Sequence, residues 1–146
     1  MDKIGRDPGW YAAMDGDLKS LSRRLKAGLN VDHADKDGTT LLWIAAHYGQ
    51  IGVVRMLLDH GAQVDLAERK YSNAPLWEAT RESCASPLRK EEHISVVEML
   101  LAAGADPSRA NKVDKTAPGW AEGQDPHRLA VQAIYRAHGY EGDFTL

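Results

Sequence analysis

Between residues 37 and 65, the hydrophobic positions follow the period of two short helices. Leu42, Ala45 and Ala46 share one face of a first helix, and the hydroxyl of Thr40 can cap its free amides. A glycine ends this helix, and a second apolar stripe then runs to another glycine. Its members are Ile51, Val53, Val54, Leu57 and Leu58. Two short helices cannot bury so broad an apolar surface against each other, so the segment predicts similar units on both sides.

The tryptophans reveal the repeat that supplies those neighbours. Trp10 and Trp43 are 33 residues apart, Trp43 and Trp77 are 34 apart, and Trp77 and Trp120 are 43 apart. Glycines follow each tryptophan at the end of the second helix. They are Gly28, Gly61, Gly104 and Gly139. Self-similarity at such a fixed period is typical of repeat architectures.

A period near 33 residues with a turn and two helices resembles the ankyrin repeat. The family signature Thr-Pro-Leu-His-x-Ala has two counterparts, Thr-Leu-Leu-Trp-Ile-Ala from Thr40 and Ala-Pro-Leu-Trp-Glu-Ala from Ala74. The sequence departs from the signature at Leu41, where the family has proline, and at the tryptophans, where it has histidine. The resemblance covers almost the whole chain. It implies an all-α ankyrin-repeat solenoid of helix-turn-helix units joined by short hairpin turns.

We therefore expect residues 1–146 to form one domain of four repeats. Their approximate bounds are 2–34, 35–67, 69–110 and 112–142. The first and last repeats carry polar residues at apolar sites, such as Arg23 and Glu122, so we expect both to act as caps. Capping at both ends predicts a complete module whose activity is binding. The third repeat holds an inserted loop at 83–92, and the tail at 140–146 either packs on the last cap or is disordered.

Composition and charge narrow the function. The 146 residues are 43% hydrophobic and 27% charged, which suits one soluble domain, and the net charge of -3 comes without a long basic block. We therefore expect no nucleic-acid partner. No window approaches the roughly 18 apolar residues of a membrane span, and the N-terminus lacks a secretory signal, so we expect no membrane partner and a cytoplasmic location.

The sequence predicts no enzyme and no cofactor. It has no Gly-x-Ser-x-Gly elbow, phosphate loop or His-Glu-x-x-His, and its carboxylates are spread over turns and exposed faces. Cys84 and His93 are close enough in sequence to suggest a nucleophile and base, but no third group would orient them. We favour a surface cysteine in the inserted loop. As the single cysteine, Cys84 excludes an internal disulfide and a Cys-based zinc site.

The histidines and tryptophans allow an alternative function. His47 and His60 lie on adjacent predicted helices, but no carboxylate or thiol has a matching helical offset, so we predict no metal site. His93 precedes a second helix, where its role is structural. The tryptophans favour a packing ladder, and the other interpretation is an exposed aromatic platform. The alternative function is therefore a small-ligand or metal-binding protein that uses the tryptophan row and His47.

The resemblance implies a protein-binding surface on the turn tips and the inward side of the first helices. The matching positions are Lys36, Asp37, Thr39, His47, Tyr48, Lys70, Tyr71, Asn73, Arg81, Glu82 and Asp114, with Arg89 and Lys90 added from the insertion. Tyrosine and arginine are enriched at interface hot spots, although mixed charge also suits a plain solvated face. The insertion is either a rim of the groove or a tolerated addition. We expect a monomer that binds another protein as an inhibitor or adaptor, such as an immunity protein that neutralises a toxin.

Overall fold

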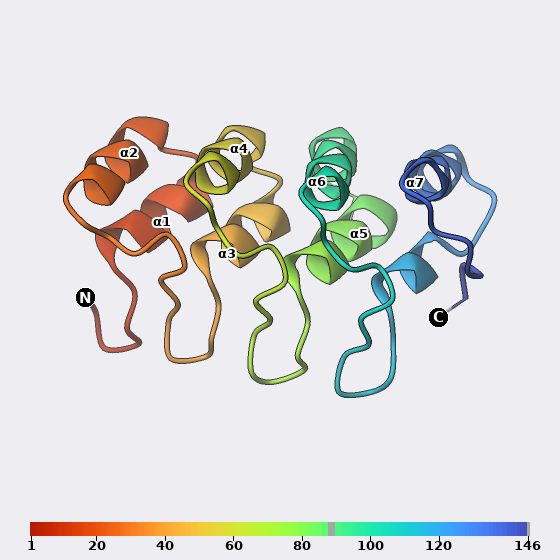
Figure 1. The fold of residues 1–146 in the computed structure, drawn as a ribbon, viewed down its shortest axis with the longest axis horizontal. Helices are drawn as coiled ribbons and strands as arrows, with labels where there is room; N and C mark the ends of the chain where they lie inside the picture. Colours follow the sequence, from red (N-terminus) through yellow and green to blue (C-terminus); the bar gives the residue numbers. More distant parts are fainter. Residues whose placement is uncertain (88–89, 146) are drawn as a thin grey trace.

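The computed structural model describes residues 1–87 and 90–145, and its helices form two parallel rows (Figure 1). One row holds α1, α3, α5 and the 3-10 helix η1, and the other holds α2, α4, α6 and α7. The bounds are Pro8–Asp15 for α1, Leu18–Lys26 for α2, Leu41–Tyr48 for α3, Ile51–Asp59 for α4, Pro75–Ala85 for α5, Lys90–Ala102 for α6, Ala117–Ala121 for η1 and Pro126–Ala137 for α7. This arrangement confirms the predicted all-α solenoid.

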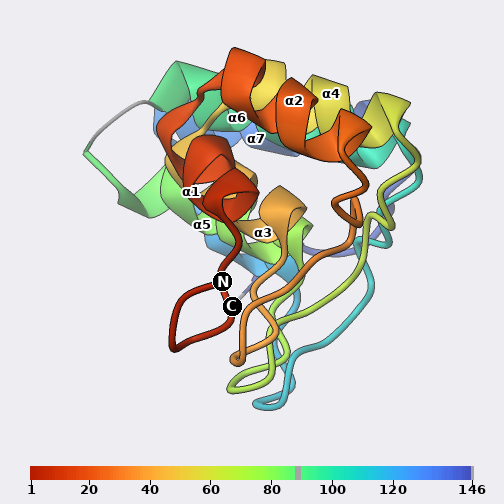
Figure 2. The same cartoon turned by 90° about the vertical axis from the view of Figure 1, so that its left-hand side faces the viewer.

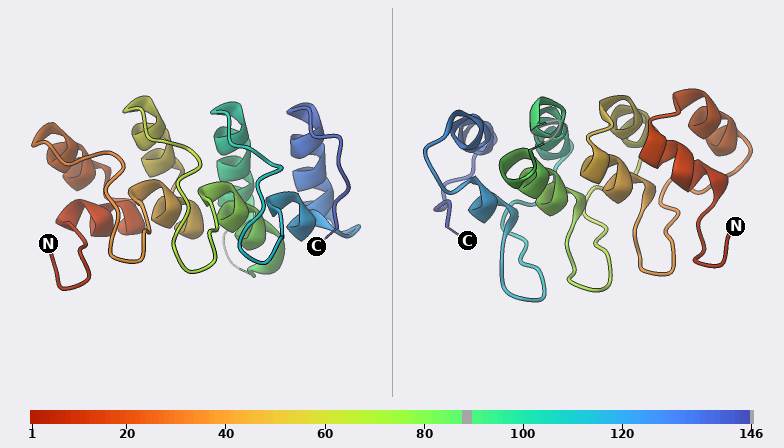
Figure 3. Two further views of the ribbon diagram at one scale, coloured as in Figure 1. Left: turned by 60° about the horizontal axis from the view of Figure 1, so that its bottom comes forward. Right: turned by 180° about the vertical axis from the view of Figure 1, so that it is seen from behind.

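Hairpin turns project from one side of the helix rows. Figure 3 shows these turns in a line along the molecule, and Figure 2 shows them at an angle to the helices. Two of them close with isolated β-bridges, Ala34 with Thr40 and Ala110 with Thr116. The turns and the row of α1, α3 and α5 therefore form two walls that meet along the length of the protein.

Capping residues set the helix ends where the sequence predicts them. The Thr40 side chain accepts a hydrogen bond from the Trp43 amide at 3.0 Å, and Asp125 accepts from two amides at the start of α7. Gly49 ends α3 with a φ of 65°, in the left-handed region that favours glycine. These caps limit α3 to eight residues, and the chain enters α4 at Ile51 directly afterwards.

The core lies between the two helix rows and runs without a break through all the helix pairs. Apolar side chains from one row contact those of the other and of the neighbouring pair. The largest fully buried side chains are Trp10, Leu21, Leu41, Leu42, Val53, Val54, Leu57, Leu76, Val96, Val97, Leu100 and Tyr135. Each pair thus depends on its neighbours to bury its apolar face.

Side chains also join each pair to the next through hydrogen bonds. The indole of Trp10 donates to the Thr39 carbonyl and that of Trp43 to the Asn73 carbonyl, both at 3.0 Å. His93 bonds through Nε2 to the His47 carbonyl at 2.7 Å, which confirms its structural role. The packing ladder predicted for the tryptophans is therefore present at Trp10 and Trp43.

The insertion in the third repeat is mostly helix, so the expected loop at 83–92 is wrong in extent. Residues 83–85 extend α5 to 11 residues, against 8 in α3, and residues 90–92 begin α6. Cys84 is only 3% exposed within α5, which corrects the surface cysteine. The run contains no glycine to stop a helix, so α5 continues past the point where α3 ends. The lengthened ends of α5 and α6 project beyond the other helices (Figure 2).

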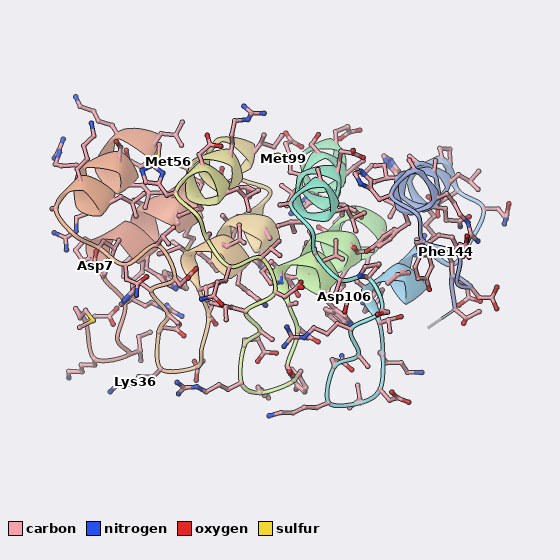
Figure 4. The ribbon with its side chains drawn as sticks, viewed as in Figure 1. Asp7, Lys36, Met56, Met99, Asp106 and Phe144 are labelled. Atoms are coloured by element: carbon pink, nitrogen blue, oxygen red, sulfur yellow. The ribbon has the colours of Figure 1, made fainter. Side chains whose placement is uncertain are left out.

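The C-terminal pair begins weakly and is closed by aromatic packing. Its first helix is the five-residue η1, where Gly119 and Glu122 take the places of the core residues Leu42 and Ala45. Tyr140 and Phe144 pack edge-on against the buried Tyr135, with ring centroids 5.7 and 6.0 Å away. Figure 4 shows Phe144 beside α7, so the described part of the tail packs on the cap. No helix in the described residues is both long and apolar enough to cross a membrane.

Candidate partner-binding groove

A groove of about 780 Å³ lies between three successive turns and the inner faces of α3 and α5. The sequence-predicted residues that line it are Asp37, Thr39, His47, Lys70, Tyr71, Asn73 and Arg81. The wall also holds Trp43 and Trp77, which belong to the tryptophan row of the alternative function, and the turn residue Val113. Glu68, Glu78 and Asn111 complete it and were not predicted from the sequence. The turns and helices thus bring most of the predicted surface to one place.

Each turn is held by an acidic or amide side chain near its start. Asp35 accepts from the amides of residues 37 and 39 at 3.0 Å, and Asn111 accepts from those of residues 113 and 115. Glu68 accepts from three amides of its own turn, at 2.6 to 3.0 Å. Backbone bonds of 2.8 to 2.9 Å then join neighbouring turns to one another. Because these groups are fixed, the groove has a largely preformed wall.

The sequence analysis missed this set of turn-holding side chains. The set includes Asp2, which accepts from the amides of Ile4 and Arg6 in the first turn. The four positions 2, 35, 68 and 111 are 33, 33 and 43 residues apart and so follow the period of the repeat. A search for polar residues at that spacing could have found them.

The third turn is one residue longer than the second. The third turn bonds to the second through the Arg69 amide, which donates to the Asp37 carbonyl, and to the fourth through the Tyr71 carbonyl, which accepts from the Lys112 amide. Lys70, between Arg69 and Tyr71, is the extra residue. Tyr71 is 47% exposed, and the Lys70 ammonium lies 4.9 Å from the centre of its ring. The extra residue explains the tryptophan spacing of 34, and it presents a cation and an aromatic ring at the middle of the groove.

An ion-pair network joins α3 to α5 at the inner wall. His47 Nδ1 lies 2.6 Å from Glu78 Oε1 and 3.7 Å from Glu82 Oε1. The Arg81 guanidinium donates to both carboxylates, at 2.5 Å for Glu82. Burial alone would raise the pKa of Glu78, but the hydrogen bonds from His47 and Arg81 outweigh it and hold that pKa below the ordinary value. Glu78 therefore stays ionised inside the protein.

This network corrects the expectation that His47 has no carboxylate within reach. Glu78 and Glu82 belong to the next repeat, 31 and 35 residues later, and not to the helices compared in the sequence. One repeat period after His47 is position 80, which lies between Glu78 and Glu82. This spacing is the sequence signal that predicts the pair. The His47 ring also stacks on Trp43, with centroids 5.6 Å apart and planes 9° from parallel.

The remaining predicted residues differ in what they offer a partner. Asn73 is buried, and its amide side chain accepts from Asn111 at 2.8 Å, so it supports the turn and presents little surface. Tyr48 is 41% exposed on α3, outside the groove lining. Lys36 and Asp114 are exposed in their turns, and Figure 4 shows Lys36 near a turn tip. Arg89 lies outside the described residues, as does the side chain of Lys90.

A row of cations along the turns was also missed. Lys3, Lys36, Arg69 and Lys112 come directly after the turn-holding residues, and all four are exposed. Lys70 and Lys115 add two more exposed charges. Within the described residues, none of the six lies within 4 Å of a carboxylate oxygen. We call these six residues the basic row, and the repeat period is the sequence signal for the first four of them.

The fold and the groove define a helical repeat protein with a preformed concave surface. Residues 10–111 match the family described as "Ankyrin repeats (3 copies)". The chain belongs to the ankyrin repeat family. This confirms the resemblance seen in its signature segments.

Curated relatives share the repeats over part of their length. The chain is similar to the "Ankyrin repeat, SAM and basic leucine zipper domain-containing protein 1" of Mus musculus, with 32% identity over 68% of this chain and 20% of that protein. The protein of the same name from Carollia perspicillata is 31% identical over 66% of this chain and 19% of its own length. That from Dasypus novemcinctus is 29% identical over 86% and 25%. The chain thus spans about a fifth to a quarter of these relatives.

Proposed function

We propose that this protein binds a partner protein in the groove between its turns and the helices α3 and α5. Ankyrin repeats are generally protein-protein interaction modules. The single observation that carries the proposal is the groove itself, whose preformed walls hold exposed aromatic and charged side chains. A preformed surface of this kind loses little conformational entropy on binding.

The partner surface that fits best is acidic. The six cations of the basic row project from successive turns. Glu68, Glu78 and Glu82 are engaged by turn amides or by Arg81, which leaves Asp37 as the exposed carboxylate of the groove lining. Charges arranged in this way speed association and select partners of opposite charge. Tyr71 and the half-buried rings of Trp43 and Trp77 would supply apolar contact below that charged edge.

For the biological role, we propose that binding itself is the activity. The protein would act as an inhibitor or adaptor without catalysis, and one concrete form is an immunity protein that covers the active surface of a toxin. We further propose that it is monomeric before binding and cytoplasmic. A toxin gene beside its own gene would support the immunity role, and size-exclusion chromatography and cell fractionation test the other two statements.

The experiment that tests the function is a pull-down from the native source with two charge-reversal variants. Lys36→Glu/Lys70→Glu/Lys112→Glu changes the basic row, and the matched control Lys19→Glu/Arg23→Glu/Lys26→Glu makes the same charge change on α2. We expect wild type and the control to capture the same protein and the row variant to capture at least about tenfold less of it. Equal loss in both variants, or capture of nucleic acid in place of protein, would contradict the proposal.

A further inference from the structure

His47, Glu78 and Glu82 form the one group of metal-ligating side chains that the described residues bring together. Their ligand atoms all lie within 4.8 Å of one another, although the residues come from two different helix pairs. One imidazole nitrogen and two carboxylates are a ligand set that zinc accepts. We propose that this group binds a single divalent cation, with zinc as the best chemical match.

The distances fit a zinc site after small side-chain movements. Zinc bonds of about 2.0–2.2 Å place the donors of a tetrahedral site about 3.4 Å apart. The His47–Glu82 separation of 3.7 Å is close to this, and the His47–Glu78 hydrogen bond of 2.6 Å needs to open by less than 1 Å. Both glutamates lie on one face of α5, because residues four apart are neighbours on a helix.

Two of the ligands are already held in place by their surroundings. The Glu78 side chain is 4% exposed in α5, so it has little freedom to turn away. The His47 ring stacks on Trp43, whose own indole is fixed by its bond to the Asn73 carbonyl. Supporting contacts of this kind orient metal ligands and raise metal affinity.

Arg81 competes with the cation for the two carboxylates. Its guanidinium now donates to Glu78 and Glu82, so it serves as the counter-ion of the group. A bound metal would replace that charge, and Arg81 would turn toward the groove that it lines. Because an ionised carboxylate only accepts hydrogen bonds, His47 Nδ1 now carries the proton that it shares with Glu78. Zinc would take the lone pair on Nδ1, and that proton would pass to solvent.

The test is calorimetric titration of the purified full-length protein with zinc chloride alone. We expect wild type to bind one equivalent, and His47→Ala and Glu82→Gln each to weaken binding at least about tenfold. Arg81→Gln removes the competing cation and should tighten binding about fivefold. The matched control is His138→Ala, because His138 contacts a single carboxylate, that of Glu98 at 2.7 Å, and should not affect the site. Circular dichroism checks that each variant is folded.

Tryptophan fluorescence gives a second readout at the site. Zinc on His47 should change the emission of the stacked Trp43, and Trp43→Phe should abolish that change while heat of binding remains. No saturable heat with either wild type or Arg81→Gln would overturn the proposal, as would an equal loss of affinity in His138→Ala. The inference goes beyond the proposed protein-binding function. The titration contains no partner, so its failure would leave the groove proposal standing.

Discussion

The tryptophans that share one repeat position make different contacts in the N-terminal and C-terminal halves. Trp10 and Trp43 each donate an indole hydrogen bond to the carbonyl of the next turn, at 3.0 Å. The Nε1 atoms of Trp77 and Trp120 are buried with no hydrogen-bond partner in the described residues. Those two rings instead pack edge-to-face, with centroids 5.5 Å apart. One residue type at one repeat position therefore joins the repeats by hydrogen bonds in the first half and by ring packing in the second.

The cause lies in the turn and the helix of the next repeat, which supply the acceptor for each indole. The carbonyl equivalent to those of Thr39 and Asn73 in the fourth turn belongs to Lys115, one residue before the N-cap of η1. The fourth turn keeps the bridge and the amide bonds of the second turn, but the helix after it is the five-residue 3-10 helix η1 and not a full α-helix. An unpaired buried N–H costs about 1–3 kcal/mol. The comparison shows that the stability of a repeat depends on its neighbour as much as on its own sequence.

The largest effect should come from replacing these tryptophans with phenylalanine. Trp43→Phe loses ring packing and one of the two donors to the Asn73 carbonyl, which keeps the Glu68 amide, so we expect unfolding to become easier by about 3 kcal/mol. Trp77→Phe loses packing but removes an unpaired N–H, so its cost should be about 1 kcal/mol or less. Urea unfolding of both variants measures the difference. Equal losses would show that the two junctions do not differ.

Loss of Arg81 should rank second. Arg81→Ala leaves the buried Glu78 carboxylate with His47 as its one remaining side-chain partner among the described residues, and we expect a loss of about 2 kcal/mol. This lies below the loss for a fully buried pair because the Arg81 side chain is 30% exposed. The comparison variant is Arg24→Ala, which breaks the outer Asp7 pair of the N-terminal cap and should cost less. A larger loss in Arg24→Ala would contradict the ranking.

The pH dependence of stability should identify the same carboxylate. The pKa of Glu78 is lower in the folded protein than its ordinary value of 4.5, so its contribution is present above that pH and is lost as the pH falls below it. We expect the stability of Glu78→Gln to fall less steeply than that of wild type as the pH is lowered from neutral. Thermal unfolding from pH 7 down to pH 3 measures this. Parallel curves for the two proteins would show that Glu78 does not contribute.

The smallest effect should come from the longer third turn. Ser72 has a φ of 59°, a left-handed conformation that costs a non-glycine residue about 1–2 kcal/mol. Glycine avoids this strain, but its greater freedom in the unfolded chain offsets part of the gain. Ser72→Gly should therefore raise stability by about 0.5 kcal/mol. Asp114 has nearly the same φ, but aspartate tolerates it better, so Asp114→Gly should gain less. The shift in the urea midpoint measures both, and a loss in Ser72→Gly would be the contrary result.

Sequence reasoning predicted the parts of the fold that depend on one repeat at a time. The tryptophan period predicted the solenoid, and Thr40 and Gly49 predicted the ends of α3, because caps and apolar stripes are local signals. The shortness of η1 also follows from local residues, since Gly119 and Glu122 stand where α3 has Leu42 and Ala45. These predictions need only the chemistry of nearby positions.

The errors concern how segments continue and how repeats meet. A long insertion without glycine was taken for a loop, but it extends α5 and buries Cys84. The carboxylates as a group were placed on turns and exposed faces, yet Glu78 is buried and pairs with His47 of the preceding helix pair. Burial and ion pairing of this kind depend on contacts between repeats, and offsets within one helix cannot show such contacts.

Hydrogen-deuterium exchange of the protein with and without its captured partner tests the central claim most directly. The claim predicts that the partner slows exchange at the turn amides around Asp37 and Tyr71 and at α3 and α5. The outer helices α2 and α4 should exchange at the same rate in both states. Protection confined to those outer helices, with unchanged exchange in the turns, would contradict the groove as the binding surface.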